Sequence, residues 1–153
     1  MPATRVQEAL TLRHQATETA LGVELPPAEL LQALRALRDT HGYRFYIVAT
    51  GIDGTESIDV VHGVRNLETG DDFFIKVRLP KEDPELDSVA FLFAGAEWHE
   101  REILDLLGVR FRSHPDPRRI LMPDEYEGHP LRKDFPMATP WGYRPAAPES
   151  EAD

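Results

Sequence analysis

The chain has 153 residues, about the length of one domain, so a two-domain enzyme is not expected. Its 17 Lys and Arg residues against 27 Asp and Glu residues leave a net charge of −10, which argues against a nucleic-acid partner because phosphate binding draws on clustered cations. Cysteine is absent, which excludes disulfides, thiolate nucleophiles and cysteine-held iron–sulfur clusters.

The first third of the chain predicts two helices with a short strand between them. Residues 4–7 have the spacing of a capping box, and a first helix is expected from there to Gly22. Residues 23–25 suit a short strand. A second helix is expected from Pro27 to the residue before His41, because four leucines follow helical spacing: Leu30, Leu31, Leu34 and Leu37.

The middle of the chain predicts an antiparallel meander. Residues 43–48 are dense in aromatic and β-branched side chains, and Asp53-Gly54 is a turn signal. Residues 58–65 and 73–79 alternate in polarity with the period of a strand. Three consecutive strands joined by short turns imply an antiparallel sheet, in which His62 is interpreted as a half-buried residue and not as a ligand.

A third helix is expected over residues 97–107, closed by Gly108, and a last strand over 109–111. On the helical wheel, Glu100 projects from the middle of the apolar face, and the opposite, polar side carries Trp98, Arg101, Glu102 and Asp105. The predicted fold class is α+β: an antiparallel sheet of three to five strands with two or three helices packed on it.

Periodicity ends after the last predicted strand. Eight of the 13 prolines lie from Pro115 onward, yet large apolar residues continue, which is not the composition of a flexible linker. We therefore expect an α/β domain over 1–111, an extended docking strap over 112–145, and a disordered acidic tail over 146–153. No secretory signal or long apolar run is visible in the sequence, so a cytosolic or peripheral protein is expected.

Two groups of residues raise the question of catalysis. Glu100 on an apolar face needs a partner, and a structural ion pair with Arg118, Arg119 or Arg132 is favoured over a general acid or base. His99, His114 and His129 could suggest a metal site, but the short ligand spacings are missing. Because prolines follow His114 and His129, these two are interpreted as hydrogen-bonding anchors of a bent main chain. Phosphate-binding loops and a serine-hydrolase motif are also missing.

Three segments carry a family resemblance: EREILDLLGVRF at 100–111, HPDPRRIL at 114–121 and EGHPLRKDFP at 127–136. Together they resemble the signature of the 30 kDa subunit family of respiratory complex I, which in bacteria is the C subunit of NADH-quinone oxidoreductase. The preceding helix and meander also look like the amino-terminal α/β region of that family. Ser113 stands where the family usually has glycine, and Pro117 where it usually has an aliphatic residue.

The resemblance implies a structural subunit without a cofactor in the peripheral arm of proton-translocating NADH:quinone oxidoreductase. Such a subunit packs beside the large quinone-site (49 kDa-type) subunit and supports electron transfer from NADH through FMN and iron–sulfur clusters, held by neighbours, to quinone. It implies a hetero-oligomer on the cytoplasmic side of the plasma membrane, held to the membrane through the complex.

No catalytic, cofactor-binding or metal-binding residue is predicted. The resemblance assigns folding and docking roles to a set of motif residues: Glu100, Arg101, Glu102, Asp105, Gly108, His114, Pro115, Arg119, Gly128, Pro130, Leu131, Arg132, Lys133 and Asp134. Trp98, Arg118 and His129 join them, since tryptophan and arginine are enriched at interfaces. Two alternatives stay open: the equivalent subunit of a [NiFe]-hydrogenase-type or other quinone-reducing membrane complex, and a stand-alone acid–base or metal-dependent enzyme using Glu100, His114 and His129.

Overall fold

The computed structural model of the chain describes residues 17–18 and 22–136. Most of the predicted first helix and all of the predicted tail over 146–153 lie outside these residues. The prediction that this helix continues to Gly22 is wrong, because Thr17–Glu18 form strand β1 and pair antiparallel with strand β2, Gly22–Leu25. The predicted short strand at 23–25 is confirmed.

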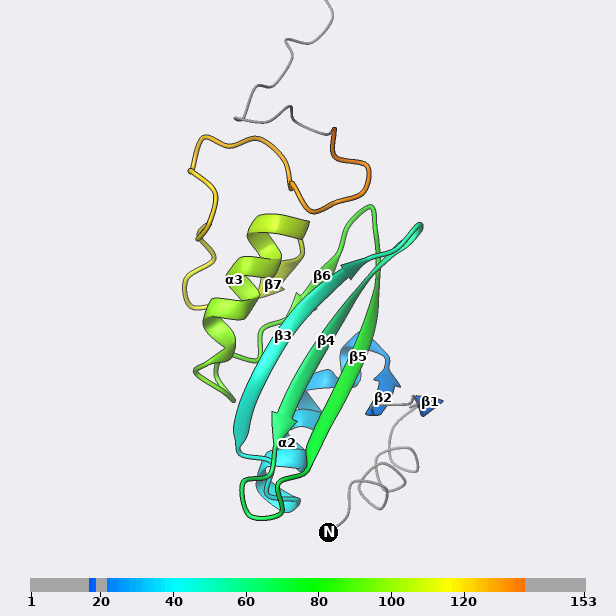
Figure 1. Cartoon of the computed structure of the whole chain (residues 1–153), viewed down its shortest axis with the longest axis vertical. Coiled ribbons are helices and arrows are strands. Elements are labelled where there is room, and N and C mark those ends of the chain that lie inside the picture. The colour runs from blue at the N-terminus through cyan, green and yellow to red at the C-terminus, as the bar shows by residue number, and fades with distance from the viewer. Residues whose placement is uncertain (1–16, 19–21, 137–153) are drawn as a thin grey trace, which may run out of the picture.

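The main sheet has five strands in the order β1-β2-β5-β4-β3 (Figure 1). Strands β3 (Phe45–Asp53), β4 (Ser57–Arg65) and β5 (Asp72–Pro80) form the predicted antiparallel meander. Strand β2 joins β5 in parallel, so the sheet is mixed. Alternation in β4 and β5 turns one set of side chains into the core and leaves the other set on the outer face.

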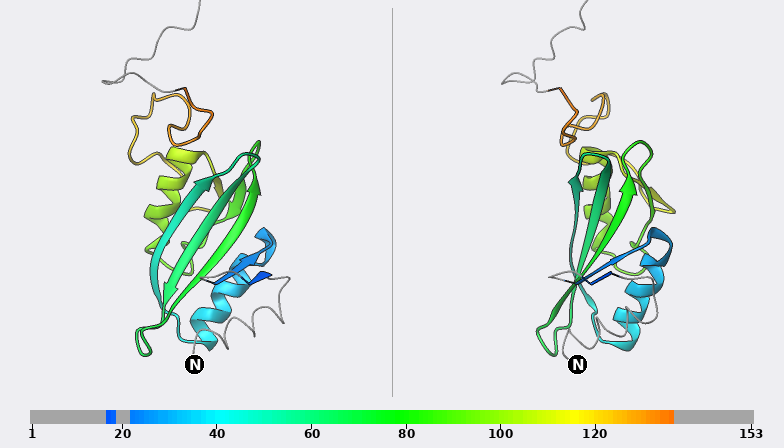
Figure 2. Two further views of the ribbon diagram at one scale, coloured as in Figure 1. Left: turned by 45° about the vertical axis from the view of Figure 1, so that its right-hand side comes forward. Right: turned by 90° about the vertical axis from the view of Figure 1, so that its right-hand side faces the viewer.

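The helices lie on the inner face of the sheet (Figure 2). A 3-10 turn η1 (Pro27–Glu29) leads into α2 (Leu30–Thr40), whose buried residues are Leu30, Ala33, Leu34 and Leu37. The second predicted helix is therefore confirmed. No helix of the described residues is long and apolar enough to span a membrane.

Helix α3 (Ala96–Leu107) confirms the third predicted helix. It packs against β3. The approach is close: a Cβ atom added to Gly51 of β3 would lie 2.2 Å from Cδ1 of Leu107. His62 is completely buried beneath this region, not half-buried as predicted, and its Nδ1 lies 2.8 Å from the Tyr46 hydroxyl. Burial lowers the pKa of His62 to about 3, so its ring is neutral at neutral pH.

A second, two-stranded sheet closes the core beside α3. Strand β7 (Arg110–Arg112) corresponds to the last strand predicted over 109–111. It pairs in parallel with β6 (Glu85–Asp87), a strand that is not predicted from the sequence. Three residues are too few to show a period. Leu86 and Phe111, one from each strand, belong to the hydrophobic core.

The strap is predicted from residue 112, which still belongs to β7, and the described residues that follow, 113–136, contain no helix or strand. It leaves β7, runs along α3 and folds over the carboxyl end of that helix (Figure 1). Its residues are half-buried or exposed, and none is fully buried. The strap therefore lies on the domain with one side facing outward.

Candidate functional site

Asp105 is the centre of the contact between α3 and the strap. Its carboxylate is completely buried, and Oδ2 accepts hydrogen bonds from the backbone N–H groups of Ile120, Leu121 and Met122 at 3.1, 2.8 and 2.8 Å. Oδ1 accepts a hydrogen bond from Arg119 Nη1 at 2.7 Å. Burial by itself would raise the pKa of Asp105, but these donors outweigh it and hold the pKa below its ordinary value. One ionised side chain thus binds a whole turn of the strap.

The carboxyl end of α3 is capped by the strap. The last carbonyl groups of a helix have no partner within the helix. Here Leu104 O accepts from Gly108 N at 2.9 Å, and the remaining three carbonyls accept from the 129–132 segment. His129 Nδ1 binds Asp105 O at 2.9 Å, Leu131 N binds Leu106 O at 3.0 Å, and Arg132 Nε binds Leu107 O at 2.7 Å. The motif around His129 is therefore a helix cap.

Two glycines make room for this cap. Gly108 has φ +74°, and a Cβ atom there would lie 2.5 Å from Cδ2 of His129. Gly128 has φ +87°, and its Cβ atom would lie 2.7 Å from Cε2 of Phe135, whose ring stacks with Tyr126. Left-handed backbone and close approach both favour glycine at these positions.

Arg101 and His114 hold the first half of the strap. Arg101 donates to the carbonyls of Arg118 and Arg119 at 3.0 and 2.9 Å, and its guanidinium lies 5.3 Å from the Trp98 ring centroid. His114 Nδ1 accepts the Asp116 N–H, which leaves Nε2 as the donor toward Glu97 O at 3.1 Å. The predicted role of His114 and His129 as main-chain anchors agrees with these contacts.

Glu100 is buried against the loop after β6. Its Oε2 accepts from the Ser88 hydroxyl at 2.6 Å and its Oε1 from Val89 N at 2.7 Å, while His114 Nε2 lies 3.6 Å from Oε2. Burial raises the pKa of Glu100 to about 7. The predicted ion pair with an arginine of the strap is wrong. Arg119 bonds to Asp105, Arg118 to Asp116 and Arg132 to Leu107 O.

The end of the described strap is held at the end of β3 and near Lys81, which follows β5. Lys133 N donates to Asp53 Oδ2 at 2.6 Å, and Lys81 Nζ lies 3.0 Å from the same carboxylate and 3.9 Å from Asp134. Burial acts to raise the pKa of Asp53, but Lys133 and Lys81 outweigh it and lower the pKa. Asp53 was not predicted as a site residue, because the pair Asp53-Gly54 was interpreted only as a turn signal.

The side of α3 that was predicted to be polar is only partly exposed to solvent. Trp98 (58% exposed) and Glu102 face outward as predicted, but Arg101 and Asp105 are buried. The strap covers that side of α3 and the sheet covers the other. A helical wheel that assumes one solvent-facing side therefore misplaces these two residues.

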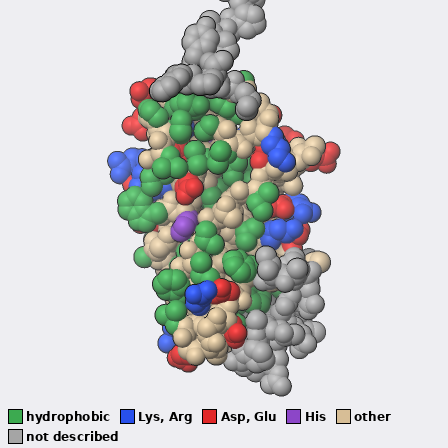
Figure 3. Space-filling view, viewed as in Figure 1, with side chains coloured by type: hydrophobic (Ala, Val, Ile, Leu, Met, Phe, Trp, Pro, Cys, Tyr) green, Lys and Arg blue, Asp and Glu red, His purple; other side chains and the backbone are tan. Residues whose placement is uncertain are grey.

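The outer side of the strap presents apolar groups. Leu121 and Leu131 are 60% and 59% exposed although their backbones are hydrogen-bonded to Asp105 and Leu106. Pro115 and Pro130 flank these anchored segments, exposed and half-buried respectively. Hydrophobic side chains gather where the strap meets α3 (Figure 3). The strap thus combines an anchored main chain with apolar side chains that face outward.

The residues considered for catalysis are each used to hold the main chain. Glu100 and His114 are neighbours, whereas His129 bonds to Asp105 near the other end of α3. Within the described residues, no group of three or more His, Cys, Asp or Glu side chains could hold a metal ion.

The chain is similar to known proteins in both sequence and fold. Residues 23–140 match the family model described as "Respiratory-chain NADH dehydrogenase, 30 Kd subunit". The chain is 39% identical over 132 residues to the C subunit of NADH-quinone oxidoreductase from Moorella thermoacetica, covering 82% of this chain and 89% of that one. It is 37% identical over 115 residues to the C/D subunit of NADH-quinone oxidoreductase from Phocaeicola vulgatus, covering 74% of this chain but 22% of that longer protein.

Two solved structures share the fold. The trypsin-resistant fragment of Nqo5 has a TM-score of 0.66 at 30% identity, covering 76% of this chain and 99% of that one. A chain of the membrane-bound sulfane sulfur reductase, an archaeal respiratory membrane complex, has a TM-score of 0.74 at 23% identity, covering 88% and 85%. The second likeness concerns the fold alone. The family model and the C-subunit relatives together show that this chain belongs to the family of the 30 kDa subunit of the respiratory-chain NADH dehydrogenase.

Proposed function

We propose that the chain is a structural subunit of the peripheral arm of proton-translocating NADH:quinone oxidoreductase, without a cofactor of its own. It supports electron transfer from NADH, through FMN and iron–sulfur clusters held by other subunits, to quinone. Its position is on the cytoplasmic side of the plasma membrane, attached through the complex. On this proposal the chain contributes shape and binding surface, and its reaction chemistry belongs to its neighbours.

The observation that carries the proposal is the anchored strap. Backbone and side-chain hydrogen bonds from Asp105, Arg101 and the carboxyl end of α3 hold residues 118–132 in place before any partner binds. Leu121 and Leu131 are thereby presented without the entropy cost of ordering a loose segment on binding. A preorganised apolar surface favours a permanent protein interface.

We propose the large quinone-site (49 kDa-type) subunit as the partner of the strap. Support comes from the Phocaeicola vulgatus relative, whose name joins the C and D subunits in one polypeptide. Two subunits fused in one chain stay close to one another at high effective concentration. A C subunit that is a separate chain must obtain the same proximity through a binding surface.

The fold alone does not distinguish between complexes that use different electron donors. A chain of the archaeal sulfane sulfur reductase has the same fold, so an equivalent role in a hydrogenase-type or other membrane complex is the second candidate. The Moorella and Phocaeicola relatives, 39% and 37% identical, carry NADH-quinone oxidoreductase names, and they favour NADH as the donor.

Purification from native membranes tests the proposal. An affinity tag on the full chain is expected to bring down the large quinone-site subunit and the flavoprotein subunits in equal stoichiometry, identified by mass spectrometry. A preparation containing nickel-site hydrogenase subunits in their place would support the second candidate. Recovery of the chain alone, or only with unrelated proteins, would contradict both.

A further inference from the structure

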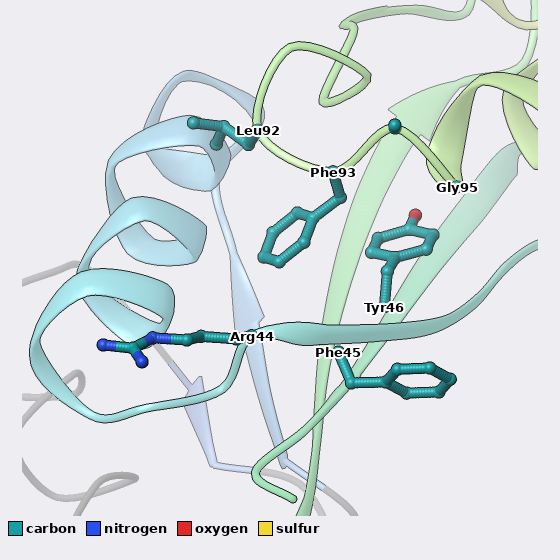
Figure 4. Close-up of a pocket in the computed structure, with 7 residues that line it drawn as sticks. Arg44, Phe45, Tyr46, Leu92, Phe93 and Gly95 are labelled. Atoms are coloured by element: carbon teal, nitrogen blue, oxygen red, sulfur yellow. The ribbon is translucent and has the colours of Figure 1, made fainter.

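A pocket lies at the amino end of α3, away from the strap. It is lined by Arg44 and the first two residues of β3, and by residues 92–95, which lead into the helix (Figure 4). Its volume is about 330 Å³, at the lower end of the range for small-molecule sites. Twelve helical residues span about 18 Å, so the pocket and the cap at Asp105–Leu107 are well separated.

The floor of the pocket is apolar and its rim is open. The rings of Tyr46 and Phe93 lie 5.3 Å apart between their centroids and form the floor (Figure 4). Phe45 is 49% exposed, and Ala94 and Gly95 are exposed as well. A large apolar side chain entering from outside would contact two aromatic rings.

The side of the pocket toward α2 is basic. Arg44 is exposed and makes no ion pair with the described residues. Arg38 donates to the carbonyl of Leu92, in the pocket wall, at 3.0 Å and also pairs with Asp39. The hydrogen bond from Arg38 lowers the pKa of Asp39, and the charges of Arg35 and Arg44 act in the same direction. Arg44 therefore adds an exposed positive charge to this side of the pocket, in a chain whose net charge is −10.

We infer that this pocket is a second docking site, which takes a protein segment presenting a carboxylate beside an apolar side chain. The carboxylate pairs with Arg44 and the apolar side chain lies on Phe93 and Tyr46. Arginine and aromatic side chains are the residues enriched at the centres of interfaces. The choice of a protein partner rests on the proposed function, because it requires a multi-subunit assembly. The chain then joins two partners, one at each end of α3.

Photo-cross-linking in the native complex tests this inference. Benzoyl-phenylalanine replaces Phe45 in one strain and Leu131 in a second, and cross-linked peptides are identified by mass spectrometry. We expect the probe at position 45 to mark one segment containing Asp or Glu, different from the segment marked at position 131. Adding Arg44→Glu should lower the yield at position 45 by about tenfold or more, since reversing a charge removes a pair and adds a repulsion.

Matched variants make the result decisive. Arg44→Lys keeps the charge and is expected to keep the cross-link, and Arg44→Glu is expected to be rescued by Asp or Glu→Arg in the marked segment. A strong cross-link at position 131 with none at position 45, cross-links at 45 only to lipid, or a yield at 45 that Arg44→Glu leaves unchanged would each overturn the second site while leaving the proposed function standing. Absence of cross-links at both positions would overturn both.

Discussion

At the scale of single residues, two buried carboxylates on one helix have opposite electrostatics. Asp105 accepts three backbone N–H groups and an arginine, and its pKa is lowered. Glu100 accepts hydrogen bonds from one hydroxyl and one N–H group and has no arginine partner, and its pKa is raised to about 7. Burial acts on both in the same direction, so the number and charge of the donors decide the outcome.

Asp105→Asn is expected to destabilise the domain by about 2–4 kcal/mol at pH 7, because a neutral amide binds the three N–H groups weakly and leaves Arg119 unpaired. The lowered pKa of Asp105 means that its stabilisation is present above its ordinary pKa of about 4 and is lost as the pH falls through its lowered pKa. Urea unfolding across pH measures this. Asp72→Asn, at the exposed ion pair with Arg65 on the sheet, is the control and should cost far less.

Glu100→Gln tests the raised pKa. The pKa of Glu100 is higher in the folded chain than in the unfolded chain. Its contribution to stability is therefore fully present below its ordinary pKa of 4.5, and that contribution is lost as the pH rises through about 7. The glutamine variant cannot ionise, so its unfolding free energy should exceed that of the natural chain above pH 7, by up to about 3 kcal/mol. Equal pH profiles for the two proteins would show that Glu100 titrates normally.

Ser113→Gly is expected to stabilise the chain by about 0.5–1 kcal/mol, measured by thermal unfolding. Ser113 has φ +60°, the left-handed region that favours glycine, and it stands where the family resemblance places glycine. Ser113→Ala keeps the backbone strain and is the control. A lower melting temperature for the glycine variant would show that the serine side chain contributes more than its backbone conformation costs.

At the scale of elements, α3 is the part of the chain that the strap completes. The sheet covers one side of the helix, Arg101 and Asp105 bind the strap on the other, and the 129–132 segment caps its last carbonyls. Helix and strap therefore depend on one another. A change that disturbs the cap should loosen both.

Gly108→Ala is expected to cost about 2 kcal/mol or more and to expose the strap to trypsin at Arg132 and Lys133. The added methyl group meets a left-handed backbone and the His129 ring at 2.5 Å. Gly95→Ala is the matched control at the other end of α3, because Gly95 has an ordinary φ of −63° and no atom within 4 Å of its Cβ position. Equal cleavage rates in the two variants would contradict the proposed dependence.

At the scale of the whole molecule, local patterns predicted most of the elements, but not β1, β6 or the contacts between distant parts of the chain. The leucines of α2 and the alternation in β4 and β5 led directly to the helix and the meander. The parallel pairing of β2 with β5 and the bond between Asp53 and Lys133, 80 residues apart, depend on the assembled fold. Asp105 was misplaced for the same reason, since a strap without periodicity covers the face that a helical wheel leaves to solvent.

The outward face of the strap provides the last prediction, which concerns assembly and not folding. Leu131→Asp, like Leu121→Asp, places a charge on a side chain that is about 60% exposed, so the melting temperature of the isolated chain should change little. If the strap docks as proposed, the same charge is desolvated in the interface, and the amount of chain recovered in the native complex should fall by about tenfold or more. Leu67→Asp is the control, because Leu67 is 69% exposed but lies in the turn between β4 and β5. Full assembly of both strap variants at the level of the control would mean that the partner binds elsewhere on this chain.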